Sequence, residues 1–265
     1  MGAFEITLSN YEGGDEEVAI PEGVTRIGRY AFANKFMMRK VAIPEGVTRI
    51  DQYAFNSSMQ LKEVAFPSTL EVIGEGAFNA CTDLLEINLS ESVKELGPRA
   101  FQRCNAVTEV VVPGSIENIP EGAFKDCRML ERVVVSEGVR TIGKDAFNGC
   151  SRLREVVLPS TLDMLEDGVF ADCTALPAID LPQSVGWIGR KCFENCTSLA
   201  RIDLPDGIGY IEERTFAGCE ALACVTVPDS VTGMEPDAFL GCTLLEAPEE
   251  EEEAAAEEED VAPEA

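Results

Sequence analysis

The stretch VRTIGKDAFNGCSRLREVVLP, residues 139–159, contains the pattern that decides the fold of this 265-residue chain. The same apolar positions return every 23 residues, and the largest of them is a Phe in ten successive units: Phe32, Phe55, Phe78, Phe101, Phe124, Phe147, Phe170, Phe193, Phe216 and Phe239. A fixed period of this length is typical of a solenoid, because each unit is too small to bury its own apolar face and stacks on its neighbours. The sequence therefore predicts one elongated domain with the ten Phe side chains in its core.

Two extended segments are predicted in each unit. Residues 153–158 alternate as in a β-strand, with Val156 and Leu158 pointing inward and Glu155 and Val157 pointing outward. In most units a Pro ends this strand, because proline has no N–H to donate to a neighbouring strand. The second extended segment is shorter and precedes the Phe.

A turn connects the second extended segment to the next strand. Residues 145–148 are predicted to form one helical or 3₁₀ turn, too short to be stable alone. Two residues after the Phe, units commonly carry a residue that tolerates a positive φ. Examples are Gly149, Asp172, Asn195 and Gly218.

The combined pattern L-x-x-V/I-x-I/L-P-x-x-V-x-x-I-G-x-x-A-F-x-x-C resembles the BspA-like, or Treponema-type, leucine-rich repeat over about residues 18–245. The resemblance implies a leucine-rich-repeat solenoid of parallel β-strands with short helical or 3₁₀ turns, here in ten 23-residue repeats. It also implies a bacterial or protist surface or interaction protein. The departures lie at the ends, where Lys35 and Ser58 replace Cys and Pro248 takes the next inward strand position.

Three segments follow from this pattern. Residues 1–17 are predicted to be an N-terminal cap, residues 18–245 the leucine-rich-repeat solenoid, and residues 246–265 a disordered acidic tail. The tail carries 11 acidic residues and no aromatic residue, so it cannot bury enough apolar surface to fold. Such tails generally keep a protein in solution, and the alternative is that this one binds a basic partner.

Charge and composition exclude several classes of function. The chain has 48 acidic and 21 basic residues, with no Lys or Arg after Arg214. The resulting field repels nucleic acid and anionic membranes and favours a basic protein partner. The chain has no His, which removes the commonest general base and the commonest metal ligand. We therefore expect no catalytic residue, no cofactor and no bound metal.

The sequence also bears on location. Residues 1–7 have neither a basic start nor an apolar run, so they do not match a secretory signal. No stretch approaches the roughly 18–20 apolar residues of a membrane span. We expect a cytoplasmic protein that is a monomer and does not enter a membrane.

Eight of the ten cysteines occupy one column, three residues after the Phe: Cys81, Cys104, Cys127, Cys150, Cys173, Cys196, Cys219 and Cys242. They are predicted to be buried, reduced thiols that pack as small apolar groups. Disulfides between neighbouring units would have poor geometry, and metal binding would need CxxC pairs or His partners. Cys192 is also expected to be buried, and Cys224 to be the most exposed and reactive thiol.

The outward positions of the strand form the first candidate site. Its members are the apolar stripe Val111, Val134 and Val157 and the charged edge Glu109, Arg132 and Glu155. An apolar stripe with a charged edge suits a protein partner. The alternative is that β-branched residues simply favour strands.

A second candidate site lies one residue before the Ile of the second extended segment. That column holds Met164, Trp187 and Tyr210 in successive units, but polar residues in most others. We expect Trp187 and Tyr210 to be exposed and stacked side by side, as aromatic anchors of an interface are. The alternative is packing against a loop or a tail.

Asp180 and Asp203 lie one unit apart, with Arg201 nearby. Two carboxylates about 5 Å apart could serve a retaining glycosidase or hold Ca²⁺. The favoured interpretation is a pair of solvated aspartates in an acidic protein.

These observations predict a noncatalytic protein–protein interaction module that presents a rigid solenoid face. The alternative is a BspA-like surface adhesin that binds host or extracellular proteins. A glycan-acting enzyme that uses Asp180 and Asp203 is the third hypothesis.

Overall fold

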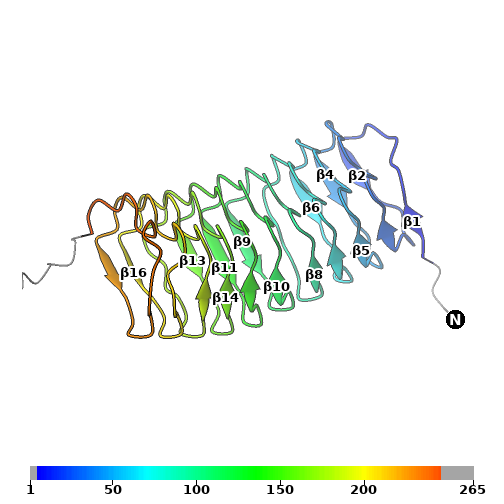
Figure 1. Ribbon diagram of the computed structural model, residues 1–265. Helices are drawn as coiled ribbons and strands as arrows, with labels where there is room; N and C mark the ends of the chain where they lie inside the picture. Colours follow the sequence, from blue (N-terminus) through cyan, green and yellow to red (C-terminus); the bar gives the residue numbers. More distant parts are fainter. Residues whose placement is uncertain (1–4, 246–265) are drawn as a thin grey trace, which may run out of the picture.

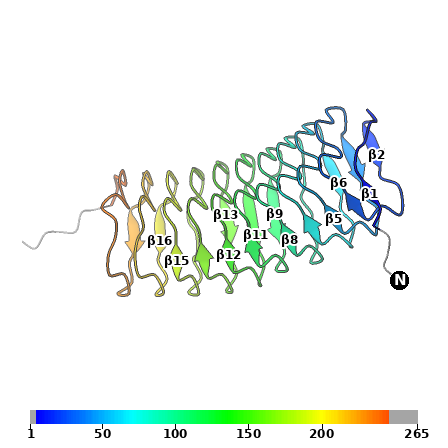
Figure 2. The same cartoon turned by 45° about the vertical axis from the view of Figure 1, so that its right-hand side comes forward.

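Each 23-residue unit forms one coil of a solenoid, and the computed structural model describes residues 5–245 of it (Figure 1). We number the coils 1 to 10 by their Phe, from Phe32 to Phe239, and each coil includes the two extended segments that precede its Phe. The strands lie in two rows along the solenoid axis, and every strand pair is parallel (Figure 2). The predicted solenoid of parallel strands is thus confirmed. The predicted tail, residues 246–265, lies outside the described residues.

The first row contains the outward-facing positions named above. Its strands are β2 (Glu17–Ala19), β4 (Lys40–Ala42), β6 (Glu63–Ala65), β9 (Glu109–Val112), β11 (Arg132–Val135), β13 (Glu155–Val157), β16 (Arg201–Asp203) and β17 (Cys224–Thr226). They form three separate sheets, β2-β4-β6, β9-β11-β13 and β16-β17. The row is interrupted at coil 4, which keeps a single bridge from Ile87 to Val110, and at coil 8. In coil 8, Pro177 stands just before the strand position and has no N–H to donate.

The second row lies on the other side of each coil. Its strands are β1 (Thr7–Leu8), β3 (Arg26–Ile27), β5 (Arg49–Ile50), β7 (Val72–Ile73), β8 (Glu95–Leu96), β10 (Asn118–Ile119), β12 (Thr141–Ile142), β14 (Met164–Leu165) and β15 (Trp187–Ile188). Neighbouring coils approach closely after this strand. A Cβ added to Gly143 would lie 2.6 Å from the carbonyl oxygen of Ile119, which favours Gly at this position, as found in five of the ten units.

The Phe side chains form one continuous stack through the core. Successive rings are 4.9 to 5.8 Å apart between centroids and tilted by at most 15°. The first nine rings are buried, as predicted, whereas Phe239 in coil 10 is only partly buried. Each inner Phe fills its coil, so truncating one to Ala is expected to cost about 3–5 kcal/mol.

The turn before each Cys is not helical, and the predicted helical or 3₁₀ turn is wrong. In the described residues no helix of either kind forms. The reason is that alternate N–H groups leave the coil. Ala146 and Asn148 donate to carbonyls within the turn, whereas the N–H of Phe147 donates to Val169 in the next coil at 3.0 Å. A helix would need all these N–H groups to donate within the segment.

Two positions in the turns of coils 1 to 9 have a positive φ, and coil 10 keeps only the second of them, at Gly241. The one after the Phe was predicted and includes Gly149 at 76° and Asp172 at 59°. The other lies two residues before the Phe and includes Tyr30 at 59° and Lys191 at 58°. It was not predicted, because the column mixes Gly and Asp with Tyr, Arg and Lys, which rarely adopt this conformation.

The cysteine column is buried as predicted, except for Cys242, which is half-buried. Each buried Sγ donates to the carbonyl oxygen of the Phe one coil earlier, as Cys150 does to Phe124 at 3.3 Å. Ser58 makes the same bond to Phe32 at 2.7 Å, so the column selects a small donor. All ten cysteines are free thiols, with Cys192 buried and Cys224 exposed as predicted.

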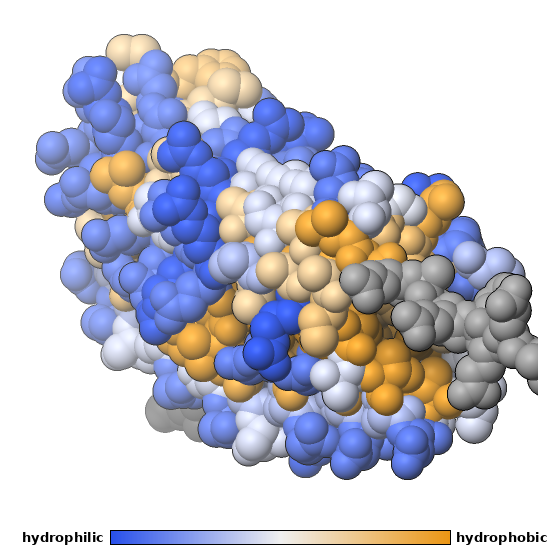
Figure 3. Space-filling model, turned by 90° about the vertical axis from the view of Figure 1, so that its left-hand side faces the viewer, coloured by the Kyte–Doolittle hydropathy of each residue, from blue (hydrophilic) through white to orange (hydrophobic). Residues whose placement is uncertain are grey.

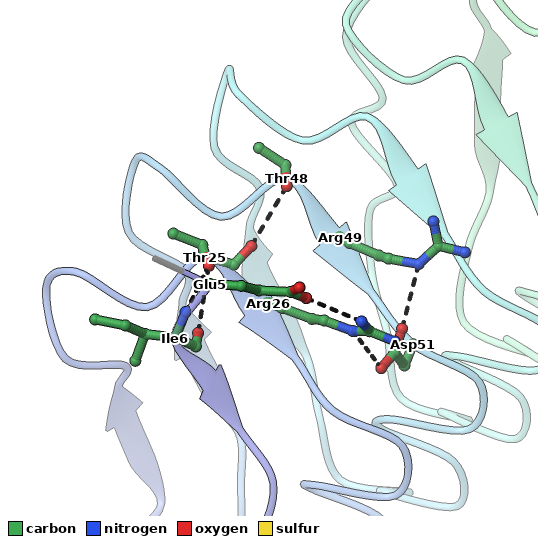
Figure 4. A network of polar contacts seen from close by, with 7 residues as sticks. All are labelled: Glu5, Ile6, Thr25, Arg26, Thr48, Arg49 and Asp51. Carbon is green, nitrogen blue, oxygen red and sulfur yellow. Dashed lines mark hydrogen bonds and ion pairs between the residues drawn. The ribbon is translucent and has the colours of Figure 1, made fainter. Parts of the chain in front are cut away.

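The N-terminal end of the solenoid is covered by residues 5–16. Strand β1 extends the second row by pairing with β3, and the Tyr11 ring lies 5.1 Å from the ring of Phe32. An ionic network fixes this segment (Figure 4): Arg26 pairs with Glu5 at 2.9 Å and with Asp51 at 2.8 Å. The hydrogen bond to Asp51 and, to a lesser degree, the one to Glu5 raise the pKa of Arg26.

Candidate protein-interaction face

The predicted valine stripe is assembled by the middle sheet of the first row. Strands β9, β11 and β13 pair in register, so Val134 lies between Val111 and Val157. Val111 is 44% exposed and Val157 42% exposed, and Val134 is half-buried between them. The stripe therefore presents apolar side chains to solvent on a face whose backbone is fixed by the strand ladder.

The charged edge of the stripe is organised around Arg132. Its guanidinium pairs with Glu109 on one side and, through Nε, with Glu155 Oε1 at 3.0 Å on the other. Hydrogen bonds to Glu155 and then to Glu109 raise the pKa of Arg132. Such exposed pairs contribute little to stability, but they hold the three side chains beside the valines in one arrangement.

A hollow adjoins the stripe where the first row is interrupted. Its volume is about 680 Å³, and its lining includes Leu85, Asn88, Thr108 and Val111. A second hollow of about 370 Å³ lies on the other side of Leu85, towards β6. Coil 4 forms no strand with β6, so its segment does not lie flush with the neighbouring strands. The two hollows meet at Leu85, which is 49% exposed.

The sequence prediction missed this hollow. Its one visible signal was Leu85, the only large apolar residue in a column that holds charged residues in half of the units, such as Arg39, Lys62, Glu131 and Arg154. An exposed group of Phe36, Met37 and Met59 was missed as well. Phe36 and Met59 share a column that is polar in all later coils, where a departure from the column would again have been the signal.

The second candidate column lies in the second row, away from the valine stripe. Met164 pairs with Trp187 across β14 and β15, and Trp187 and Tyr210 are both exposed. Tyr210 donates its hydroxyl to Glu235 at 3.2 Å. The expected stacking of Trp187 on Tyr210 is wrong: the ring pairs of the described residues do not include these two. The ladder of β15 ends before coil 9, so nothing aligns the two side chains.

The two aspartates are not aligned by a common strand ladder. Arg201 pairs with Asp203 at 2.7 Å, and Thr226 also donates to Asp203. The hydrogen bond from Thr226 and the one from Arg201 lower the pKa of Asp203, whereas a general acid needs a raised pKa. Asp180 lies in coil 8, outside both neighbouring ladders.

Within residues 5–245, no group of three His, Cys, Asp or Glu side chains is placed to hold a metal ion. The same range contains no helix of the length and hydrophobicity that crossing a membrane requires.

The comparisons with known proteins agree with this geometry. Two matches to the BspA type leucine-rich repeat region cover residues 11–131 and 117–246. The crystal structure of the T. pallidum leucine-rich repeat protein superimposes with a TM-score of 0.64 at 30% identity, over 70% of this chain and 90% of that one. A leucine-rich repeat protein from Eubacterium ventriosum gives a TM-score of 0.58 at 17% identity, over 92% and 90% of the two chains, and supports the fold alone.

No curated protein matches the chain. The two family matches together cover nearly all of the described residues, and the ten-coil architecture is the one the repeat implies. This chain therefore belongs to the BspA-type leucine-rich repeat family.

Proposed function

We propose that this chain is a noncatalytic module that binds another protein through the first row, at coils 4 to 7. One observation carries the proposal: the hollow at coil 4 opens beside the valine stripe, and Leu85 and Val111 are exposed within it. An apolar depression with a charged edge is the usual anatomy of an interface centre and its rim. The strand ladder fixes this face in advance, so little ordering entropy would be lost on binding.

The family supports the same conclusion, since such repeats are typically interaction modules without catalytic activity. A basic partner is favoured by the chain's formal charge of -27. The monomeric state and a cytoplasmic location stay predictions, and a surface adhesin would use the same face on an extracellular protein. Cell fractionation with antibodies against the native protein distinguishes the two locations.

The test is affinity capture from a native lysate with full-length protein and two double variants. Leu85→Glu with Val111→Glu places charge in the hollow, and Trp187→Ala with Tyr210→Ala is the matched control on the second row. Circular dichroism checks that both variants fold. We expect the first variant to lose the captured partner by at least about tenfold, because a buried unpaired charge costs more than 1.4 kcal/mol. If this variant retains the partner and the control loses it, the proposal is contradicted and the partner binds at the second row.

A further inference from the structure

Three continuous chains of peptide hydrogen bonds run along the turns from coil to coil. In the central chain, the N–H of each Phe donates to a carbonyl of the next coil, from Phe32 to Ala54 through to Phe216 to Ala238, at 2.7 to 3.0 Å. The flanking chains begin at Tyr30 and Asn34 and follow the same direction. All three chains therefore point their N–H groups towards the C-terminal end and their carbonyls towards the N-terminal end.

This arrangement is electrically similar to an α-helix, in which three hydrogen-bonded chains also run along the axis. Aligned peptide dipoles add up to roughly half a positive charge at the end where N–H groups are free. In a parallel strand ladder, by contrast, successive peptide dipoles alternate and nearly cancel. The turns thus give the whole solenoid a positive pole at coil 10.

The two poles end differently. At the N-terminal pole, the N–H of Tyr11 donates to the carbonyl of Ala31 at 2.9 Å, so residues 5–16 continue the central chain. At the C-terminal pole, the N–H groups of Phe239 and Gly241 have no acceptor among the described residues, although their equivalents in coil 9 donate forward. One flanking chain is closed by a side chain, because the N–H of Arg214 donates to the carboxylate of Asp237 at 3.3 Å.

The same end is apolar at its centre and acidic around it. Leu240 is 59% exposed and Leu244 56% exposed, and Figure 3, which looks onto this end, shows hydrophobic side chains gathered there. Residues 215–245 include acidic residues but no Lys or Arg: Glu220, Asp229, Glu235 and Asp237. A segment that covers this end must bring carbonyl oxygens, apolar side chains and positive charge.

Two occupants fit poorly. A second copy joined end to end through coil 10 would set N–H groups against N–H groups and acidic residues against acidic residues. A second copy joined through its coil 1 would find that position taken by residues 5–16. The sequence of residues 246–265 has 11 acidic residues, no Lys or Arg, and Pro248 where the next inward residue would stand. Charge and pattern therefore disfavour this segment too.

We propose that coil 10 is a docking site for an extended, basic segment of a partner protein, which adds to the solenoid as an eleventh layer. Its carbonyl oxygens accept the N–H groups of Phe239 and Gly241, its apolar residues cover Leu240, and its Lys or Arg residues lie beside Glu235. Strand addition of this kind takes its affinity from main-chain hydrogen bonds and its specificity from alternate side chains. The site is independent of the hollow at coil 4.

The test uses full-length protein and a synthetic peptide that copies residues 139–158 with Cys150→Ser. This segment carries four basic and two acidic residues, so it has the charge and the apolar spacing that the site requires. Binding is measured by calorimetry, and hydrogen exchange follows the amides of Phe239 and Gly241. We expect binding that slows exchange at both amides by at least about tenfold. A scrambled peptide of the same composition controls for charge alone.

Protein variants locate the binding. Leu240→Lys should weaken binding of the peptide by about tenfold or more, and Met37→Lys, at an exposed apolar side chain near the N-terminal end, should leave it unchanged. Equal binding of the scrambled peptide, or full binding to the Leu240→Lys variant, would overturn the proposal. Slow exchange at Phe239 and Gly241 in the free protein would also overturn it, because the chain itself would then occupy the site.

Discussion

The two ends of this solenoid are built from the same repeat but are finished differently. At the N-terminal end, Tyr11 extends the ring stack beyond Phe32 and Arg26 joins Glu5 to Asp51. At the C-terminal end, Phe239 is the last ring, and the N–H groups of Phe239 and Gly241 have no acceptor in residues 5–245. A repeat specifies its own neighbours but not its terminus, so a closed end needs a dedicated segment and an open end is available for a partner.

The largest expected effect is a loss of stability at alkaline pH, which comes from the coils beyond the N-terminal two. Coils 1 and 2 have Lys35 and Ser58 in the cysteine column, whereas coils 3 to 9 each bury a thiol there. Burial raises the pKa of Cys81 and Cys127 to about 12 from an ordinary value of 9.0. The unfolded chain therefore loses these protons first, so the free energy of unfolding is unaffected below pH 9 and falls as the pH rises above it. The expected loss is about 1.4 kcal/mol per pH unit for each thiol.

Urea unfolding between pH 8 and pH 10 measures this slope. Cys127→Ser is the matched control, because serine makes the same hydrogen bond at position 58 and does not ionise in this range. For this variant, the free energy of unfolding should fall less steeply with pH, by about 1.4 kcal/mol per pH unit, which is the contribution of one thiol. A free energy of unfolding that does not change between pH 8 and pH 10 would show that the thiols are not buried as described.

Truncating the ring stack should depend on position. Phe124→Ala removes a buried ring between two neighbours and should lower the free energy of unfolding by about 3–5 kcal/mol. Phe239→Ala removes a partly buried ring with one neighbour and should cost about 1–2 kcal/mol. Urea denaturation of both variants gives the comparison. Equal losses would mean that coil 10 is covered as completely as the middle of the stack.

The cap can be removed from the closed end. Tyr11→Ala exposes the face of Phe32 and leaves the N–H of residue 11 in place, so we expect a loss of about 1–2 kcal/mol from the lost ring contact. Hydrogen exchange should accelerate at Phe32 and Tyr30 but not at Phe147. Faster exchange throughout the chain would indicate that the cap holds the whole solenoid rather than its first coil.

Much of the fold followed from the period, because a single repeat determines which residues face the core. The strand alternation, the Phe stack and the buried thiols are all consequences of local pattern repeated at one spacing. The turn was predicted wrongly, because the direction of the Phe147 N–H is decided by a carbonyl in the next coil. The hollow at coil 4 depends on strand pairing that is lost around Ile87, which no single unit reveals. Trp187 and Tyr210 share a column but not a ladder, so their predicted stacking failed.

The smallest expected effect concerns Cys224, the exposed thiol beside the open end. A thiol reagent at neutral pH should modify Cys224 first and change the free energy of unfolding by less than about 0.5 kcal/mol. The eight buried thiols should react only on unfolding. Mass spectrometry of the modified protein identifies the site. Rapid modification of Cys150 would contradict the burial of the column.

The most direct test of the proposed interaction face is a photo-reactive amino acid placed at position 85 in the full-length protein and, as controls, at positions 59 and 187. Illumination in native cells or lysate joins the side chain to whatever lies against it. The proposal predicts one discrete protein adduct from position 85, and a much weaker one or none from the two control positions, which are also exposed. An adduct from position 59 or 187 with none from position 85 would contradict binding at the hollow of coil 4.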